Sequence, residues 1–415
     1  MVGGDGISIS CGNTFVLAGN SANSVLALHG RTLGVLRMKV FDADTHALEP
    51  MEMWREYVEP RYRDAVPRLI VDENNIERMV IGDKVMAPGP FPIGGVGVPG
   101  GLTDPDSVKS TTWDKAYPGG WDAAVRIKDM DAEGIHQTVI YTSVGLFFGG
   151  DEDPQLIGAL CRAYNNWIAD WCKQAPERFS AMAIVPLMDV EAAVVEARRA
   201  IEQLGLKGVM LRPNPYAGRM LHDPAYAPFW SELQGLGVPV AFHEGNTGNI
   251  PFVGAERCKK NPGFDNPGYL AFALAHIVCH PHEQEIAAMQ MIAGGVLEKF
   301  PRLKVAFMES GCGWLPYWLH RMDEHLEALP YFLPHLKMSP TDYFKRQCWV
   351  ATEGEEADLA GVLRYLGDDR VVWASDYPHF DCKLPGALDW CKRSGLSEPV
   401  LEKLLWKNAV ALYGF

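Results

Sequence analysis

The chain has 415 residues, of which 47% are hydrophobic and 22% are charged, a composition typical of a folded globular protein with a sizeable core. Its formal net charge of -14 opposes binding to nucleic-acid phosphates, and it has no run of about 18 apolar residues that could span a membrane. We therefore expect neither a nucleic acid nor a membrane as a partner. The nine cysteines are odd in number and form no Cys-x-x-Cys pair, which indicates free thiols in the cytoplasm.

Residues 1–37 differ from the rest of the chain. They are rich in Gly, Ser, Asn and Val, and they lack the charged start and apolar stretch of a signal peptide. Met38 stands directly before the first strong strand signal, so the native protein could begin there. We treat residues 1–37 as an extension that is either non-native or disordered, and residues 38–415 as one folded unit.

Eight short apolar segments alternate with helical segments from residue 39 onward, the pattern of parallel βα units. This predicts an α/β fold, a (β/α)8 TIM barrel. The alternative is an open doubly wound sheet, but the glycine-rich phosphate loop that usually follows its first strand is absent. The expected strands are Lys39–His46, Ile135–Ser143, Phe179–Pro186, Lys207–Pro213, Val238–Gly245, Leu303–Ser310, Gln347–Glu353 and Arg370–Tyr377.

Two segments interrupt this alternation. Residues from about 50 to 120 contain many glycines and prolines, and we expect a loop-rich insertion that covers the barrel mouth. Residues 245–267 follow the fifth strand and are expected to form another wall of the pocket.

Charged residues stand where the expected strands end, and in a barrel these ends face one mouth. Asp44 and His46 are two apart on the first strand and therefore share a side. His243, Glu309 and Asp376 end the fifth, sixth and eighth strands. This mixture of imidazoles and carboxylates suits Zn, Fe or Mn, although each residue alone could equally cap a loop or form an ion pair.

Further residues are candidates for roles around this site. Pro281 is expected to break a helix just after His280, so that His280 could point into the pocket; a helix cap or a buried structural histidine is the alternative. His379 follows Asp376 closely and is expected to orient it, with Glu49 as another acid beyond the ligands. Arg212 ends the fourth strand and could bind a substrate carboxylate or pair with a loop acid. Phe147 and Phe148 lie on an expected mouth loop and suggest an aromatic ligand.

Four motifs in this order resemble the amidohydrolase-related family, and more narrowly its aminocarboxymuconate-semialdehyde decarboxylase-like branch. They are residues 42–49 (DADTHALE), His243, residues 294–305 (GGVLEKFPRLKV) and residues 374–379 (ASDYPH). The resemblance runs from about Lys39 to Phe415.

The resemblance implies a barrel with one catalytic divalent metal, usually Zn or Mn, and members that are often dimers. His46, His243 and Asp376 match metal ligands of the family. Asp44 stands where many members have a histidine and some decarboxylases have an acid. Glu309 departs from the pattern, because many members have a histidine there that serves as acid and base. Either Glu309 or His280 would then take that role, and either could also bind the metal.

Four functions remain open at this point. The first choice is a hydrolase in which the metal lowers the pKa of a bound water toward about 7, with Asp376 accepting the proton and Glu309 or His280 passing it on. The second is a non-oxidative decarboxylase. The third is an oxygenase with two irons held by the same acids and histidines. The fourth is a barrel that binds a ligand without catalysis.

Overall fold

A computed structural model of the chain describes residues 38–86, 89–148, 153–245 and 267–415. The expectations for residues 1–37, and for most of the segment 245–267, lie outside these residues. Residues 39–415 form one compact unit, which contains all the predicted strands.

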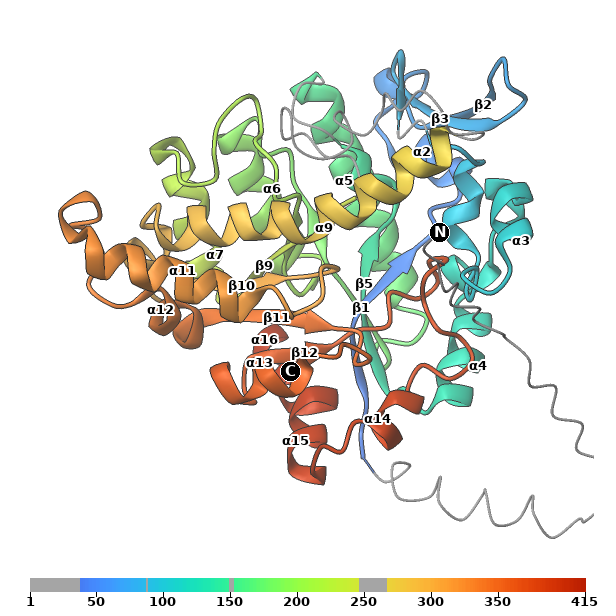
Figure 1. Ribbon diagram of the computed structural model, residues 1–415. Helices are drawn as coiled ribbons and strands as arrows, with labels where there is room; N and C mark the ends of the chain where they lie inside the picture. Colours follow the sequence, from blue (N-terminus) through green and yellow to red (C-terminus); the bar gives the residue numbers. More distant parts are fainter. Residues whose placement is uncertain (1–37, 87–88, 149–152, 246–266) are drawn as a thin grey trace, which may run out of the picture. The chain divides into compact units, whose positions relative to one another are not determined.

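The core of this unit is a set of parallel strands (Figure 1). Three strands pair in the order β1-β5-β6 and six in the order β12-β11-β10-β9-β8-β7. Almost every strand residue is buried, as expected for a parallel sheet that is covered by helices. The strands are β1 (Phe41–Ala47), β5 (Gln137–Thr142), β6 (Phe179–Ala181), β7 (Ala183–Ile184), β8 (Val209–Leu211), β9 (Pro239–Phe242), β10 (Lys304–Phe307), β11 (Cys348–Thr352) and β12 (Val371–Trp373).

The two groups of strands meet at both edges. Only Met182 separates β6 from β7, so the expected third strand is present with one interruption. On the other side, the backbone N–H of His46 donates to the carbonyl of Tyr377 (2.6 Å) and the N–H of Asp376 donates to the carbonyl of Asp44 (3.1 Å). These bonds join β1 to the segment after β12 and complete the predicted barrel of eight strands.

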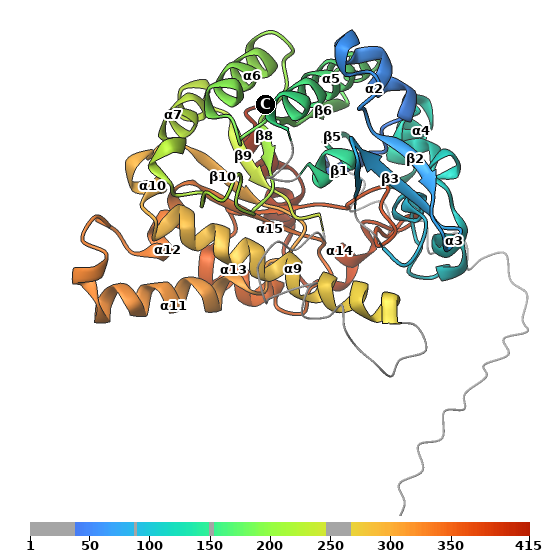
Figure 2. The same cartoon turned by 90° about the horizontal axis from the view of Figure 1, so that it is seen from above.

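Helices connect the strands and lie outside them, as Figure 2 shows for α4 to α7. Among the described residues, no helix is both long and apolar enough to cross a lipid bilayer. The helices are α2 (Met51–Tyr57), α3 (Pro105–Ser110), α4 (Ala123–Glu133), α5 (Pro154–Cys172), α6 (Val190–Glu202), α7 (Ala227–Leu236), α9 (Pro267–Ile292), α10 (Val296–Lys299), α11 (Leu315–Ala328), α12 (Pro340–Gln347), α13 (Leu359–Leu366), α14 (Asp389–Arg393), α15 (Glu398–Glu402) and α16 (Asn408–Tyr413), with a π-helical turn at Lys403–Lys407.

Helix α9 corrects one expectation. We expected Pro281 to end one helix and start another, but α9 runs through it from Pro267 to Ile292. A proline inside a helix removes one backbone hydrogen bond and need not end the helix where side-chain packing continues on both sides. Ile277, whose carbonyl loses its partner, is exposed, so water can replace that bond.

The segment between β1 and α4 is more regular than expected. It holds α2, α3 and an antiparallel sheet of β2 (Arg68–Val71), β3 (Glu77–Ile81) and β4 (Lys84–Met86). Turns with positive φ at Asn75 and Gly82 connect these short strands. Because the strands are short and the turns are close together, the sequence of this segment is similar to that of a loop. Further along, the N–H groups of Gly100 and Leu102 donate to the carbonyls of Cys382 and Phe380, so this segment packs on the loop that follows Asp376.

Candidate metal and active site

The residues expected at the strand ends come together. Asp44 and His46 project from β1, His243 directly follows β9, and Asp376 follows β12. All four are buried, at 0% exposure for the first three and 6% for Asp376. Asp376 adopts a positive φ of 60°, an uncommon conformation for a residue other than glycine that recurs at functional sites.

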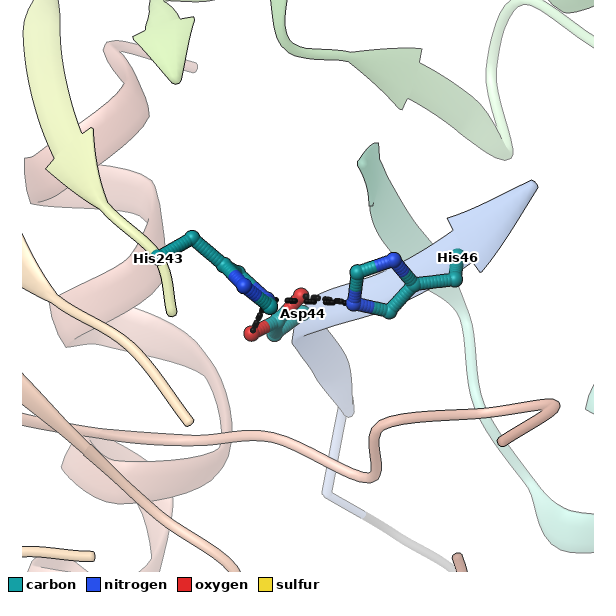
Figure 3. Close-up of side chains that lie close together, drawn as sticks. All are labelled: Asp44, His46 and His243. Atoms are coloured by element: carbon teal, nitrogen blue, oxygen red, sulfur yellow. Dashed lines mark hydrogen bonds and ion pairs between the residues drawn. The ribbon is translucent and has the colours of Figure 1, made fainter. Parts of the chain in front are cut away.

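The side-chain atoms of these four residues lie close together, and Figure 3 shows three of them pointing at one another. The Nε2 atoms of His46 and His243 are 3.0 Å apart. His46 Nε2 is 3.5 Å from Asp44 Oδ1 and 3.2 Å from Asp376 Oδ1, and His243 Nε2 is 3.1 Å from Asp44 Oδ2. Asp44, His46 and His243 form one potential ligand group, and His46, Asp376 and His379 form a second that shares His46.

Backbone carbonyls determine which nitrogen of each ring carries the proton. His46 Nδ1 is 3.0 Å from the carbonyl of Thr142, and His243 Nδ1 is 3.1 Å from the carbonyl of Glu244. A carbonyl only accepts, so both Nδ1 atoms donate and both neutral rings present an Nε2 lone pair. The two lone pairs therefore face each other beside two carboxylates, an arrangement that needs a cation between them.

A proton on His243 would satisfy only part of this arrangement. Burial lowers the pKa of His243, but the carboxylates of Asp44 and Asp376 and the backbone carbonyl of Glu244 together outweigh burial and leave the pKa raised. Such a proton would still leave Asp376 Oδ1 without a hydrogen-bond partner. Burial and the neighbouring charge of His379 lower the pKa of His46 to about 3, so this ring stays in the neutral form that binds metals.

The spacing of these atoms fits a divalent ion. Two ligand atoms each about 2.1 Å from one ion lie about 3.0–3.4 Å apart when the angle between them is about 90–110°. The observed separations of 3.0 to 3.5 Å match this range. The set of two imidazoles and two carboxylates suits Zn, Mn or Fe.

Other predicted residues support these ligands. His379 Nδ1 bonds to Asp376 Oδ2 (3.1 Å), its Nε2 is 2.9 Å from the hydroxyl oxygen of Ser143, and its ring stacks on His46 with centroids 3.9 Å apart. Burial would raise the pKa of Asp376, but His379 and His46 hold it well below the ordinary value. His379 therefore contacts both Asp376 and His46, the position in which a residue behind a metal ligand would orient it.

Glu49 contacts a neighbour of His46 and not the clustered side chains themselves. Its carboxylate accepts a bond from the Thr142 hydroxyl and another, of 3.0 Å, from the backbone N–H of Val144. These bonds fix the end of β5, whose Thr142 carbonyl holds His46. Glu49 therefore reaches the site through Thr142 rather than as a ligand.

Glu309 and His280 lie on the far side of His243. Glu309 Oε2 is 3.1 Å from His243 Nδ1, the ring atom that faces away from Asp44. His280 Nδ1 donates to the backbone carbonyl of Glu309 (2.8 Å), which leaves a buried Nε2 lone pair without a hydrogen-bond partner. Neither belongs to a ligand group among the described residues, so both fit a role beside the metal better than a role as ligands.

Asp381 is a residue of the site that sequence reasoning missed. It lies 3.7 Å from His276 Nε2, and burial together with the negative charge of Asp376 raises its pKa well above the ordinary value. One signal for Asp381 was present in the sequence, because it stands two residues after His379 in the same loop.

The two phenylalanines that were expected to contact substrate, Phe147 and Phe148, are buried. Phe148 packs against Trp54 with ring centroids 5.8 Å apart.

The amidohydrolase family model (Amidohydro_2) matches residues 41–415. The chain belongs to the amidohydrolase family. Among curated relatives, 2-amino-3-carboxymuconate-6-semialdehyde decarboxylase of Dictyostelium discoideum is 29% identical over 71% of this chain and 77% of its own length. Gamma-resorcylate decarboxylase of a Polaromonas species is 27% identical over 69% of this chain and 86% of its own length.

Solved structures of the family share the fold. An amidohydrolase from Mycobacterium avium subsp. paratuberculosis superposes with a TM-score of 0.73 at 24% identity and covers 91% of this chain and 98% of its own. A 5-carboxyvanillate decarboxylase from Novosphingobium aromaticivorans, solved with manganese, superposes with a TM-score of 0.63 at 19% identity over 92% and 97% of the two chains. The curated relatives favour the decarboxylase alternative over the hydrolase that the sequence suggested first.

Proposed function

We propose that this chain is a metal-dependent, non-oxidative decarboxylase of a small aromatic or similarly unsaturated carboxylic acid. The observation that carries this proposal is the pair of facing Nε2 lone pairs on His46 and His243, flanked by Asp44 and Asp376. The two curated relatives described above, which match across about 70% of the chain, are both decarboxylases. The manganese of the 5-carboxyvanillate decarboxylase makes Mn²⁺ the first ion to supply.

The reaction replaces a carboxyl group with hydrogen. The bond between the carboxylate carbon and the ring carbon breaks, CO2 leaves, and the electron pair remains on the ring carbon until a proton joins it. A bound divalent ion would supply positive charge that orients the substrate oxygens and stabilises the electron-rich ring. Asp44, His46, His243 and Asp376 would hold that ion.

The proton must come from an acid beside the ion. Glu309 is the first candidate, because it lies behind His243 and because burial and the charge of Asp376 raise its pKa well above the ordinary value. Asp376 and His280 are the alternatives, and each would first have to take up a proton, since both have a lowered pKa. The side chains of all three are at most 12% exposed, which excludes most bulk water and strengthens their electrostatic contacts with a substrate.

The test is release of CO2 from a panel of hydroxylated benzoates, including 2,6-dihydroxybenzoate, by protein loaded with Mn²⁺. We expect one CO2 and one decarboxylated ring per turnover, without consumption of O2. Asp376→Asn should abolish the reaction, whereas His320→Ala, an exposed residue of α11, should leave it unchanged. Hydrolysis of esters or lactones of these acids without release of CO2 would instead support a hydrolase, and O2 consumption by protein with two irons would support an oxygenase.

Exchange of ring hydrogen in the product separates the three acids. Proton transfer is reversible, so product incubated with enzyme in D2O should gain deuterium at the carbon that carried the carboxylate. We expect the substitution that removes the proton donor, among Asp376→Asn, Glu309→Gln and His280→Gln, to abolish this exchange in NMR spectra.

A further inference from the structure

Arg212 is a buried guanidinium that has no acidic partner among the described residues. It directly follows β8 and is 3% exposed. Its Nη2 donates to Asn214 Oδ1 (2.7 Å), and its backbone N–H donates to the hydroxyl of Tyr216 (2.8 Å). Among the described residues, no carboxylate lies within ion-pair distance of it, so the loop acid considered from the sequence is not found there.

Two buried nitrogen atoms of this pair, Arg212 Nε and Asn214 Nδ2, have no acceptor among the described residues. The bond from Nη2 fixes the amide oxygen of Asn214 toward the arginine, which leaves its NH2 group as a donor. A buried cation and amide without acceptors are costly, and such groups in folded proteins normally have a partner.

Arg126 is a second buried arginine, and its hydrogen bonds provide a comparison. Its Nε donates to the carbonyl of Gly119 (2.8 Å), and its two other nitrogens donate to the Thr45 hydroxyl and the His46 carbonyl. Each of its nitrogens therefore has an acceptor within the protein. Arg212 differs from Arg126, because its Nε has no acceptor among the described residues and a bound ligand could supply one.

The strand register places Arg212 beside the ligand cluster. Leu211 of β8 pairs with Phe242 of β9, and the N–H of His243 donates to the carbonyl of Leu211 (2.9 Å). Arg212 and His243 are the next residues on these neighbouring parallel strands. Side chains at equal level on such strands share a face, so Arg212 lies on the face from which His243 reaches Asp44.

A cation in this position is suited to a carboxylate that stays on the substrate. During decarboxylation, negative charge leaves the reacting carboxylate for the ring. A guanidinium on that carboxylate would stabilise the starting state more than the transition state and slow the reaction. The same guanidinium on a second, unreacting carboxylate would contribute binding in both states and fix the orientation of the ring.

We propose that Arg212 and Asn214 form an anion site for a second carboxylate, so that the substrate is a dicarboxylated ring. This inference rests on the proposed decarboxylase function and specifies its substrate class. Arg212 Nε–H and Asn214 Nδ2–H donate to the two oxygens of the unreacting carboxylate. The carboxylate that leaves as CO2 would lie at the ion that His46 and His243 would hold.

The test compares two unreactive ligands, isophthalate with two carboxylates and benzoate with one, by calorimetry on protein loaded with Mn²⁺. A charge-assisted hydrogen-bonded contact predicts that isophthalate binds about 10- to 100-fold more tightly. Arg212→Met should remove this preference. Asn214→Asp should also remove it at nearly constant volume, because the new carboxylate pairs with Arg212 inside the protein.

Arg198→Met is the matched control, because Arg198 is half-exposed on α6, where it pairs with Glu232, and its loss should leave the preference intact. Equal binding of the two ligands to native protein, no binding of either, or a preference that survives both site variants would overturn the proposal. Ligand binding needs no turnover, so the two proposals fail separately. A preference for isophthalate, together with no CO2 release from hydroxylated benzoates or hydroxylated isophthalates, would contradict the decarboxylase and leave the anion site standing.

Discussion

Removal of the divalent ion should lower the thermal stability of the protein by several degrees. The ion would stabilise only the folded state, because Asp44, His46, His243 and Asp376 converge only after β1, β9 and β12 have assembled. With free metal at about 1,000 times its Kd, this linkage contributes about 4 kcal/mol to the free energy of unfolding.

The expected shift in Tm follows from the size of the folded unit. An unfolding entropy of about 2 cal/mol/K per residue gives roughly 0.8 kcal/mol/K for the unit formed by residues 39–415. The contribution of about 4 kcal/mol therefore corresponds to a shift in Tm of about 5 °C.

Scanning calorimetry of protein treated with a chelator, before and after addition of Mn²⁺, measures this shift. Native protein and His320→Ala should regain the full Tm, whereas His46→Ala should show no increase on addition of Mn²⁺. An equal increase in His46→Ala would refute the reasoning, because the ion would then stabilise the fold at another place.

Three further substitutions test the supports of the site and the fold. His379→Ala should weaken metal affinity about 10- to 100-fold, as measured by competition with a coloured chelator, because Asp376 loses the ring that orients it. Tyr413→Phe should lower the free energy of unfolding in urea by about 1–2 kcal/mol, because its hydroxyl donates to the Ala43 carbonyl (2.7 Å) in β1 and bonds to Tyr141; an unchanged midpoint would show that these bonds contribute nothing. Gly354→Ala should lower it by about 2–4 kcal/mol, because Gly354 has a φ of 87° and its added Cβ would overlap the Trp390 ring; wild-type stability would contradict this packing.

The convergence of the ligands could be predicted because it depends on short-range patterns. Asp44 and His46 are two residues apart on a strand, and possible metal ligands end three more strand signals, at His243, Glu309 and Asp376. In a parallel barrel, all such ends open at one mouth, so topology alone brings them together. The barrel itself followed from the alternation of strand and helix signals.

The contacts that make these residues a candidate metal site could not be predicted. The tautomers of His46 and His243 depend on the carbonyls of Thr142 and Glu244, and a backbone carbonyl carries no sequence signal. The role of Glu49 depends on Thr142, which lies 93 residues away. The sequence left open whether Arg212 binds a substrate carboxylate or a loop acid, and only the structure shows that it lacks an acid among the described residues.

Local sequence signals also failed in two elements. Pro281 favours a helix end, but the long helix α9 continues through it. The glycines and prolines between β1 and α4 favour loop, but turns at Asn75 and Gly82 connect a small antiparallel sheet. In both cases, tertiary packing outweighed the propensity of individual residues.

The number of divalent ions bound per chain, measured by elemental analysis of purified protein, tests the ligand assignment most directly. We predict one ion per native chain, and none in Asp376→Ala or in a variant that combines His46→Ala with His243→Ala. Retention of one ion by the double variant would contradict the assignment of these residues as its ligands.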